Sequence, residues 1–144
     1  MSRTNNGPDD IGFLLAKASQ RFNELLVERF AARGFGDVRP SFGSILVPLF
    51  AEDGLRLGEL AARARLSKQS VTGLVKLCEE ADIVARERDA EDGRAFRIRL
   101  SARGRKLRTV ATRESRSLDA QLIKSLGATR HAALRSSLKG VMNL

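Results

Sequence analysis

The most constraining feature of the sequence is a change of hydrophobic period near residue 82. Before it, residues 57–64 and 68–81 carry apolar side chains at helical spacing, and only Arg65-Leu66-Ser67 separates the two segments. After it, residues 83–88 and 95–100 alternate apolar and charged side chains, as strands do. The residues between those strands, 89–94, are typical of a turn. This order predicts two short helices followed at once by a β-hairpin.

Amphipathic helices are expected on both sides of this segment. The N-terminal one runs from Ile11 to Phe30, with Pro8 and Asp9 suiting its start. A short helix follows Ser41, its expected N-cap, and contains Pro48, which either kinks the helix or delays its start.

The C-terminal part of the chain is predicted to be entirely helical. Ser101 is the expected N-cap of a long helix that Gly127 closes, and a last helix covers residues 128–142. The sequence therefore predicts a mainly α (α+β) fold.

Charge and composition limit the classes of function. The 144 residues include 26 Lys and Arg against 17 Asp and Glu, a net charge of +9, and the excess lies after residue 66. A basic surface attracts polyanions, which favours nucleic acid as a partner. One cysteine, Cys78, and one histidine, His131, exclude a Cys/His metal cluster, and nothing completes a catalytic triad, so no enzyme activity and no cofactor are expected.

The same pass along the chain gives an expectation about its location. No apolar run approaches the ~18 residues of a membrane span, and residues 1–10 are polar and lack a signal-peptide segment. We expect a cytoplasmic protein with no membrane partner.

The second short helix carries a polar face that could bind DNA. With Leu66, Val71, Leu74 and Val75 turned inward, the opposite face presents the candidate DNA-binding residues Ser67, Lys68, Gln69, Ser70, Thr72, Gly73 and Lys76. Glutamine can pair with adenine, threonine can meet a thymine methyl group or a polar base edge, and lysine can meet guanine or phosphate. The two serines near the helix N-terminus suit phosphate, and the glycine allows the backbone to approach DNA closely. The alternative interpretation is that this polar face is only solvated and binds nothing.

The hairpin adds candidate residues beside that helix. Its outer face offers Arg94, Arg97 and Arg99, and an arginine at a hairpin tip can enter the narrow minor groove. Asp92 could hold Arg86 or Arg94 in place through a charge-assisted hydrogen bond.

At these residues the sequence resembles the MarR family of bacterial transcriptional regulators. The resemblance lies in Leu60-Ala61, Leu66-Ser67, Val71-Thr72-Gly73-Leu74-Val75, Ile83-Val84-Ala85-Arg86, Asp92-Gly93-Arg94 and Ile98-Arg99-Leu100-Ser101-Ala102-Arg103-Gly104. One departure is Ala81-Asp82-Ile83, where the family often has Gly-Leu before the strand, which should stiffen the turn.

The resemblance implies a winged helix-turn-helix whose long N- and C-terminal helices form a homodimer. It implies that residues 68–81 read the major groove, that Arg94 enters the minor groove, and that Arg86 and Asp92 shape the wing. We therefore count Arg86, Arg94 and Arg97 with the DNA-binding residues and Asp92 as wing-supporting. It also implies repression at pseudo-palindromic operators, relieved by a small aromatic effector or by oxidation of a cysteine.

The expected organisation is a flexible tail at 1–10, a dimerisation helix and loop at 11–40, a DNA-binding region at 41–101, and dimerisation helices at 102–144. Two other functions stay open: a ligand- or protein-binding module without specific DNA readout, and a nonspecific nucleic-acid binder. Cys78 is either a buried core residue or a redox sensor, and His131 is expected at the surface or a helix end. The phenylalanines either belong to the core or line an effector cleft; they are Phe13, Phe22, Phe30, Phe42 and Phe50.

Overall fold

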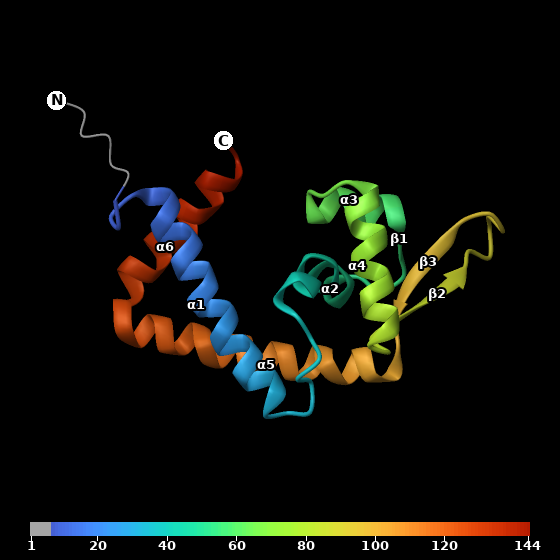
Figure 1. Cartoon of the computed structure of the whole chain (residues 1–144), viewed down its shortest axis with the longest axis horizontal. Coiled ribbons are helices and arrows are strands. Elements are labelled where there is room, and N and C mark those ends of the chain that lie inside the picture. The colour runs from blue at the N-terminus through green and yellow to red at the C-terminus, as the bar shows by residue number, and fades with distance from the viewer. Residues whose placement is uncertain (1–6) are drawn as a thin grey trace. The chain divides into compact units, whose positions relative to one another are not determined.

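The computed structural model describes residues 7–144, which are mainly helical with one small sheet (Figure 1). The helices are α1 (Ile11–Ala31), α2 (Gly43–Ala51), α3 (Leu57–Ala64), α4 (Lys68–Glu80), α5 (Ala102–Leu126) and α6 (Ala128–Met142), with a short 3-10 helix at Pro40–Phe42. The strands are β1 (Leu55–Arg56), β2 (Val84–Arg88) and β3 (Phe96–Leu100). The predicted mainly helical, winged helix-turn-helix fold is confirmed.

The chain forms two compact units, one ending at Val110 and the other comprising Ala111–Leu144. The boundary falls inside α5, so that helix contributes residues to both. The predicted division into a tail, a DNA-binding region and two dimerisation regions stays a prediction, and most of the predicted tail lies outside the described residues.

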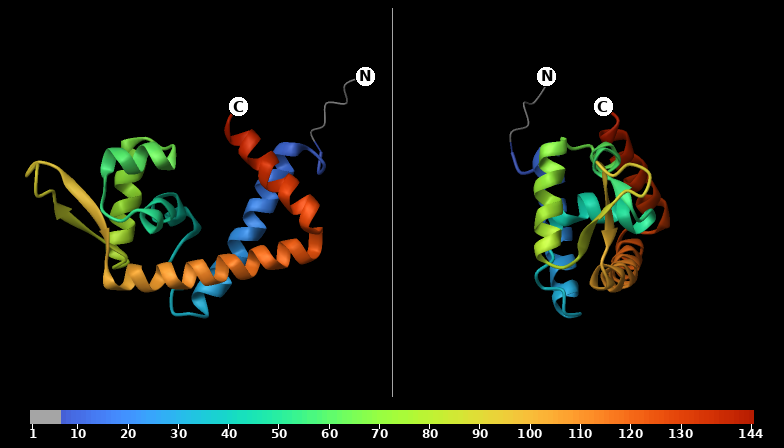
Figure 2. Two further views of the ribbon diagram at one scale, coloured as in Figure 1. Left: turned by 180° about the vertical axis from the view of Figure 1, so that it is seen from behind. Right: turned by 90° about the vertical axis from the view of Figure 1, so that its right-hand side faces the viewer.

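In the first unit, β2 and β3 form the predicted hairpin, with Val84 opposite Leu100 and Arg88 opposite Phe96. We call this hairpin and its connecting loop the wing; its far end projects beyond α3 and α4 (Figure 1 and the left view of Figure 2). The strand β1 was not predicted. It pairs antiparallel with β3, which therefore lies in the centre of the sheet, in the order β1-β3-β2.

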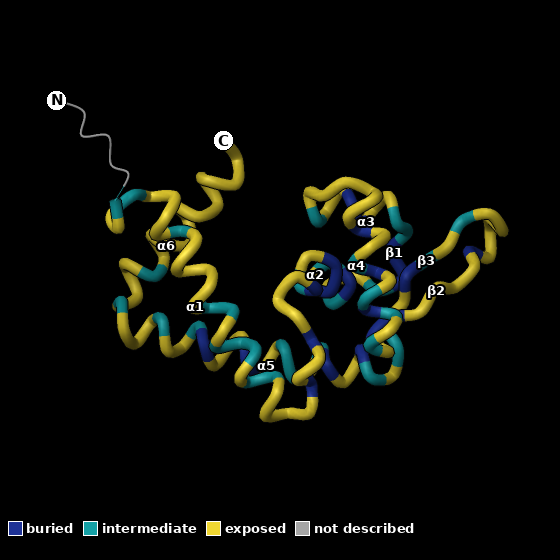
Figure 3. Tube along the Cα trace, viewed as in Figure 1, coloured by how far each residue is buried: buried dark blue, intermediate teal, exposed yellow. Residues whose placement is uncertain are grey.

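The core of the first unit lies under α4 and the sheet (Figure 3). Leu60, Val71 and Val75 are fully buried, as the predicted inward faces of the two short helices require. The expectation for Leu66 is wrong, because its side chain is 38% exposed. The chain leaves α3 through Arg65, whose φ of 55° lies in the left-handed region.

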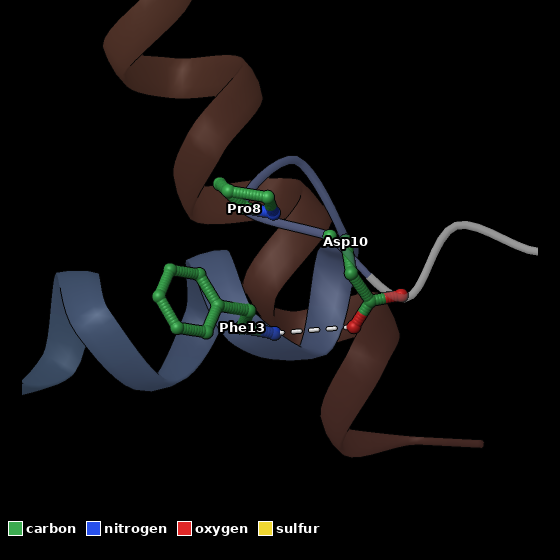
Figure 4. Close-up of a pocket in the computed structure, with 4 residues that line it drawn as sticks. Pro8, Asp10 and Phe13 are labelled. Atoms are coloured by element: carbon green, nitrogen blue, oxygen red, sulfur yellow. Dashed lines mark hydrogen bonds between the residues drawn. The ribbon is translucent and has the colours of Figure 1, made fainter.

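The helix starts differ in detail from the predictions. Helix α1 begins immediately after Asp10, whose carboxylate accepts the backbone N–H of Gly12 at 3.1 Å and that of Phe13 at 3.3 Å. Figure 4 shows the second of these bonds. A hollow at this end of the helix is lined by Gly7, Pro8, Asp10 and Phe13. The Phe13 ring is 46% exposed, so it is not the core residue that helical spacing suggested.

Helix α2 begins at Gly43 rather than after Ser41, which lies in the 3-10 helix and does not cap. Pro48 lies inside α2, so of the two expected effects of this proline the delayed start of the helix is wrong. Of the predicted core rings, Phe42 is buried, and Phe30 and Phe50 pack against the core as partly buried residues.

The turn after α4 sets the direction of the wing. The N–H of Ile83 donates to the carbonyl of Cys78, and the N–H of Asp82 donates to that of Glu79, both at 2.9 Å. This pair of bonds is the Schellman motif, whose left-handed position is usually glycine. Here Asp82 occupies it, with φ 56°, and its carbonyl accepts the Ser101 hydroxyl at 2.6 Å.

The second unit consists of the end of α5 and α6. His131 lies in the first turn of α6, at a helix end, which was one of its two expected positions. Its Nε2 lies 2.6 Å from a carboxylate oxygen of Asp119, and its side chain is only 14% exposed. Several apolar side chains of α6 are exposed: Leu134, Leu138, Val141 and Met142. Within residues 7–144 there is no helix with the length and apolar character that crossing a membrane requires.

Candidate nucleic-acid interface

Helix α4 presents its predicted polar face to solvent (Figure 3). All seven candidate residues on it are exposed: Ser67, Lys68, Gln69, Ser70, Thr72, Gly73 and Lys76. The buried residues Val71, Val75 and Cys78 lie on the opposite side of the helix and hold it against the core. We call Gln69, Thr72, Gly73 and Lys76 the reading face.

Hydrogen bonds organise the start of this helix. The Ser67 hydroxyl oxygen accepts the N–H of Ser70 at 3.1 Å, so Ser67 is the N-cap, as predicted. The same hydroxyl donates to the Ser70 hydroxyl at 2.9 Å. The Ser67 hydroxyl therefore both donates and accepts within the helix start, and has no proton left for a ligand. The Ser70 hydroxyl only accepts in this pair, so its proton can be donated to an anion at the helix N-terminus.

Thr72 has a narrower chemistry than its residue type suggests. Its hydroxyl donates to the carbonyl of Lys68, one turn earlier, at 2.7 Å. A hydroxyl has a single proton, so Thr72 can offer a base edge only its methyl group and an acceptor oxygen.

The tip of the wing presents Arg94 to solvent. The Arg94 N–H donates to the Asp92 carboxylate at 3.1 Å, an Asx-type turn that sets the backbone at the tip. Within residues 7–144, no hydrogen bond or ion pair engages the Arg94 side chain. Asp92 therefore supports the tip by binding the backbone N–H of Arg94. The expected charge-assisted bond from Asp92 to the side chain of Arg86 or Arg94 is not formed in the described residues.

The other arginines of the wing have partners inside the unit. Arg86 pairs with Glu79 of α4 at 2.9 Å, which ties the base of the wing to the helix that carries the reading face. Arg99 pairs with Glu87 on the neighbouring strand at 2.6 Å. Arg97, expected on a free outer face, donates to the carbonyl of Gly54 at 2.9 Å and is half-buried.

Asp89 is the residue that joins the wing to the helix-turn-helix, and sequence reasoning missed it. Its side chain is only 2% exposed, and one carboxylate oxygen accepts two hydrogen bonds from Arg56, at 2.9 and 2.6 Å. Arg97 Nε lies 3.1 Å from the same oxygen. The N–H of Glu91 and the guanidinium of Arg56 together lower the pKa of Asp89 to about 2.

This network defines where the wing stands. Arg56 immediately precedes α3, whereas Asp89 begins the loop at the wing tip, so their ion pair fixes the wing against the start of the first short helix. No local pattern signals the pair, because 33 positions separate its members. Arg94 lies in the loop that Asp89 begins, five residues beyond this ion pair.

The thiol of Cys78 faces the core. The residue is fully buried, and burial raises its pKa to about 12. The prediction of a buried core residue is confirmed, and this environment is the opposite of the exposed, low-pKa surroundings of reactive cysteines.

Residues 49–95, which include α3, α4 and most of the wing, match the model of the MarR family. A solved structure of a MarR-family transcriptional regulator from Rhodococcus sp. RHA1 superimposes with a TM-score of 0.72 at 26% identity, covering 96% of each chain. The part of the chain that carries α3, α4 and most of the wing is therefore similar to the MarR family. That family consists of transcriptional regulators and not of enzymes.

Two curated relatives that the chain matches are also regulators. The exopolysaccharide II synthesis transcriptional activator ExpG of Rhizobium meliloti is 30% identical over 98 residues, which is 68% of this chain and 50% of the relative. An HTH-type transcriptional repressor of Mycobacterium tuberculosis is 31% identical over 86 residues, 60% of this chain and 62% of the relative. The matches thus span half to somewhat under two thirds of these relatives.

Two further solved structures share the fold. One is a complex of Staphylococcus aureus MepR with DNA, with a TM-score of 0.78, 20% identity, and coverage of 93% of this chain and 97% of that one. The other is CouR from Rhodococcus jostii RHA1 bound to p-coumaroyl-CoA, with a TM-score of 0.70, 25% identity, and coverage of 92% and 91%.

Proposed function

We propose that this chain is a homodimeric, sequence-specific regulator that binds double-stranded DNA, with α4 in the major groove and the Arg94 side chain in the minor groove. The observation that carries the proposal is the pairing of an exposed reading face on α4 with a wing tip where Asp92 fixes the backbone and Arg94 is exposed. A helix of this kind fits the major groove, and the narrow minor groove attracts arginine. MepR, which shares this fold, was solved in complex with DNA, in line with a DNA-binding role.

Each proposed contact has a distinct chemistry. Gln69 can form a bidentate pair with adenine, whereas Lys68 and Lys76 meet guanine or phosphate. Ser70 meets a phosphate at the start of α4. We assign Arg86 and Arg97 a supporting role in this interface, because their guanidinium groups already bind Glu79 and the Asp89 carboxylate.

Dimerisation is proposed from exposed apolar side chains on both terminal helices. Ile11 and Leu14 of α1 are 70% and 45% exposed, and Leu138 and Val141 of α6 are 43% and 46% exposed. Such residues on helical stripes are ordinarily covered in the functional protein. A twofold dimer would place two copies of α4 about one turn of DNA apart, 34–36 Å, and would select a pseudo-palindromic site.

Repression is the favoured outcome of binding, since occupying a promoter excludes polymerase without any further contact surface. The Mycobacterium tuberculosis relative is a repressor, whereas ExpG is an activator. We further propose that a small aromatic anion relieves repression, in line with the p-coumaroyl-CoA complex of CouR.

A DNA-selection experiment tests the proposal. The full chain selects duplexes from a random-sequence pool at physiological salt, and fluorescence anisotropy then compares the selected duplex with a scrambled one. We expect an affinity ratio of at least ~1,000, and a particle of two 15.8 kDa chains in light scattering. A ratio near one would favour a nonspecific binder, and no binding would favour a module that lacks DNA readout.

The variant Arg94→Ala tests the wing. We expect binding to the selected duplex at least tenfold weaker, with a loss of A·T preference beside each half-site. The matched control is Arg116→Ala in α5, which removes the same charge outside the candidate interface and should change affinity less than about twofold, because salt screens it. Equal effects of the two variants would show that only net charge matters.

A further inference from the structure

Gly73 has no structural reason to be glycine. It lies in the middle of α4, in ordinary right-handed helical conformation, and is absent from the positive-φ glycines Gly34, Gly54 and Gly127. Apart from its two chain neighbours and the adjacent backbone of α4, a Cβ atom added at Gly73 would meet no heavy atom of the described residues within 4 Å. Glycine inside a helix costs about 1 kcal/mol relative to alanine. Neither backbone geometry nor packing within the chain offsets that cost.

Gly73 also lies at the centre of the reading face. At 100° per residue, it stands about 160° round the helix from each of the buried residues Val71 and Val75. A helix seated in the major groove turns the stripe opposite its buried face toward the base edges, while the phosphates flank it on both sides. The missing side chain therefore leaves a notch facing the floor of the groove.

The chemistry of the notch is apolar. The N–H and C=O groups of Gly73 belong to the helical hydrogen-bond ladder, so its exposed atoms include no free donor. Beside it, Thr72 has committed its hydroxyl proton to the Lys68 carbonyl and retains its methyl group. Of the groups that base pairs present in the major groove, the thymine C5-methyl is the apolar one.

We propose that Gly73 and Thr72 form a notch that receives a thymine methyl group in each half-site, which makes Gly73 a specificity-determining residue. The inference rests on the proposed DNA-binding function and adds to it the base that this part of α4 selects. Gln69 and Lys76, one turn to either side, would read the neighbouring bases by hydrogen bonding.

The test replaces thymine by deoxyuridine, which removes only the methyl group, at each position of the duplex selected by the wild-type chain. We expect one position per half-site at which the replacement weakens wild-type binding about fourfold, the equivalent of about 0.8 kcal/mol for one buried methyl-sized group. Gly73→Ala should bind the thymine duplex at least tenfold more weakly and lose the distinction between thymine and deoxyuridine there. Thr72→Ser, which keeps the hydroxyl, should reduce that distinction.

Thermal unfolding separates loss of recognition from loss of folding. Gly73→Ala should raise the Tm by about 3 °C, because alanine favours the helix. Gly43→Ala is the control: Gly43 is the first residue of α2, outside the reading face and the proposed dimer interface, and a Cβ there also meets nothing within 4 Å, so its replacement should leave the Tm no lower and DNA binding unchanged.

The outcomes are distinguishable. Wild-type preference for the selected duplex without any deoxyuridine effect overturns the notch and leaves the proposed function standing. So does a Gly73→Ala variant that binds as tightly as the wild type or still distinguishes the two bases. A wild-type chain that prefers no duplex overturns both the function and the notch.

Discussion

The only cysteine of this chain should be chemically inert while the protein is folded. Cys78 is fully buried, with an exposed fraction of 0%, and packs in the same core as Val71 and Val75. Reaction with a disulfide reagent or peroxide requires both access and a thiolate. Both are missing, so we expect no modification of the native protein and no redox control of DNA binding.

The expected suppression can be worked out from the pKa. Burial raises the pKa of Cys78 from an ordinary 9.0 to about 12. At pH 8 a thiol with a pKa of 9 is about one tenth thiolate, whereas one with a pKa of 12 is about one part in ten thousand. Thiolate abundance alone therefore lowers the rate about a thousandfold, and burial of the sulfur lowers it further. Labelling should then proceed only through molecules that have opened or unfolded.

The assay is the release of thionitrobenzoate from Ellman's reagent at pH 8 in increasing urea. We expect the labelling rate to follow the unfolded fraction measured by circular dichroism on the same samples. Peroxide treatment without urea should leave the affinity for the selected duplex unchanged in the wild type and in Cys78→Ala. Labelling of the native chain as fast as the urea-unfolded chain, or peroxide-induced release of DNA by the wild type alone, would refute this reasoning.

Two further predictions concern the wing and the turn that precedes it. Asp89→Asn removes the charge that Arg56 and Arg97 share, so the variant should be less stable to urea at pH 7 and bind the selected duplex more weakly. Because the folded-state pKa of Asp89 is lowered, its contribution to the free energy of unfolding is fully present above the unfolded-state pKa of 3.8 and is lost as the pH falls toward about 2. The difference in stability between the wild type and Asp89→Asn should therefore close over that range. A difference that stays constant down to pH 2 contradicts the assignment. Asp82→Gly should raise the free energy of unfolding by about 1 kcal/mol, since glycine adopts the left-handed conformation without strain. The control Glu80→Gly, inside α4, should lower the free energy of unfolding by about 1 kcal/mol. A loss of stability in Asp82→Gly would show that Asp82 is not strained.

The periodicity of the sequence determined most of the elements, because the signals for them are local. The spacing of apolar side chains placed α3 and α4 to within a residue, and Ser67 and Ser101 were identified as caps since a cap bonds only three residues ahead. Alternation in the 83–88 and 95–100 segments gave the wing. The exposed reading face of α4 followed from the same spacing, because burying Val71 and Val75 exposes the opposite side of the helix.

Tertiary structure alone decided which wing arginines are free and which are engaged. The strand β1 is two residues long, too short for any period, and exists because Leu55 pairs with Ile98 across the sheet. That pairing brings Arg56 beside Asp89 and the Gly54 carbonyl beside Arg97, contacts that span 33 and 43 positions of the chain. Sequence shows that an arginine is present, but its availability depends on the acceptors that folding places around it. The side chain of Arg94 therefore stays exposed at the tip, whereas that of Arg97 is held by Asp89 and the Gly54 carbonyl.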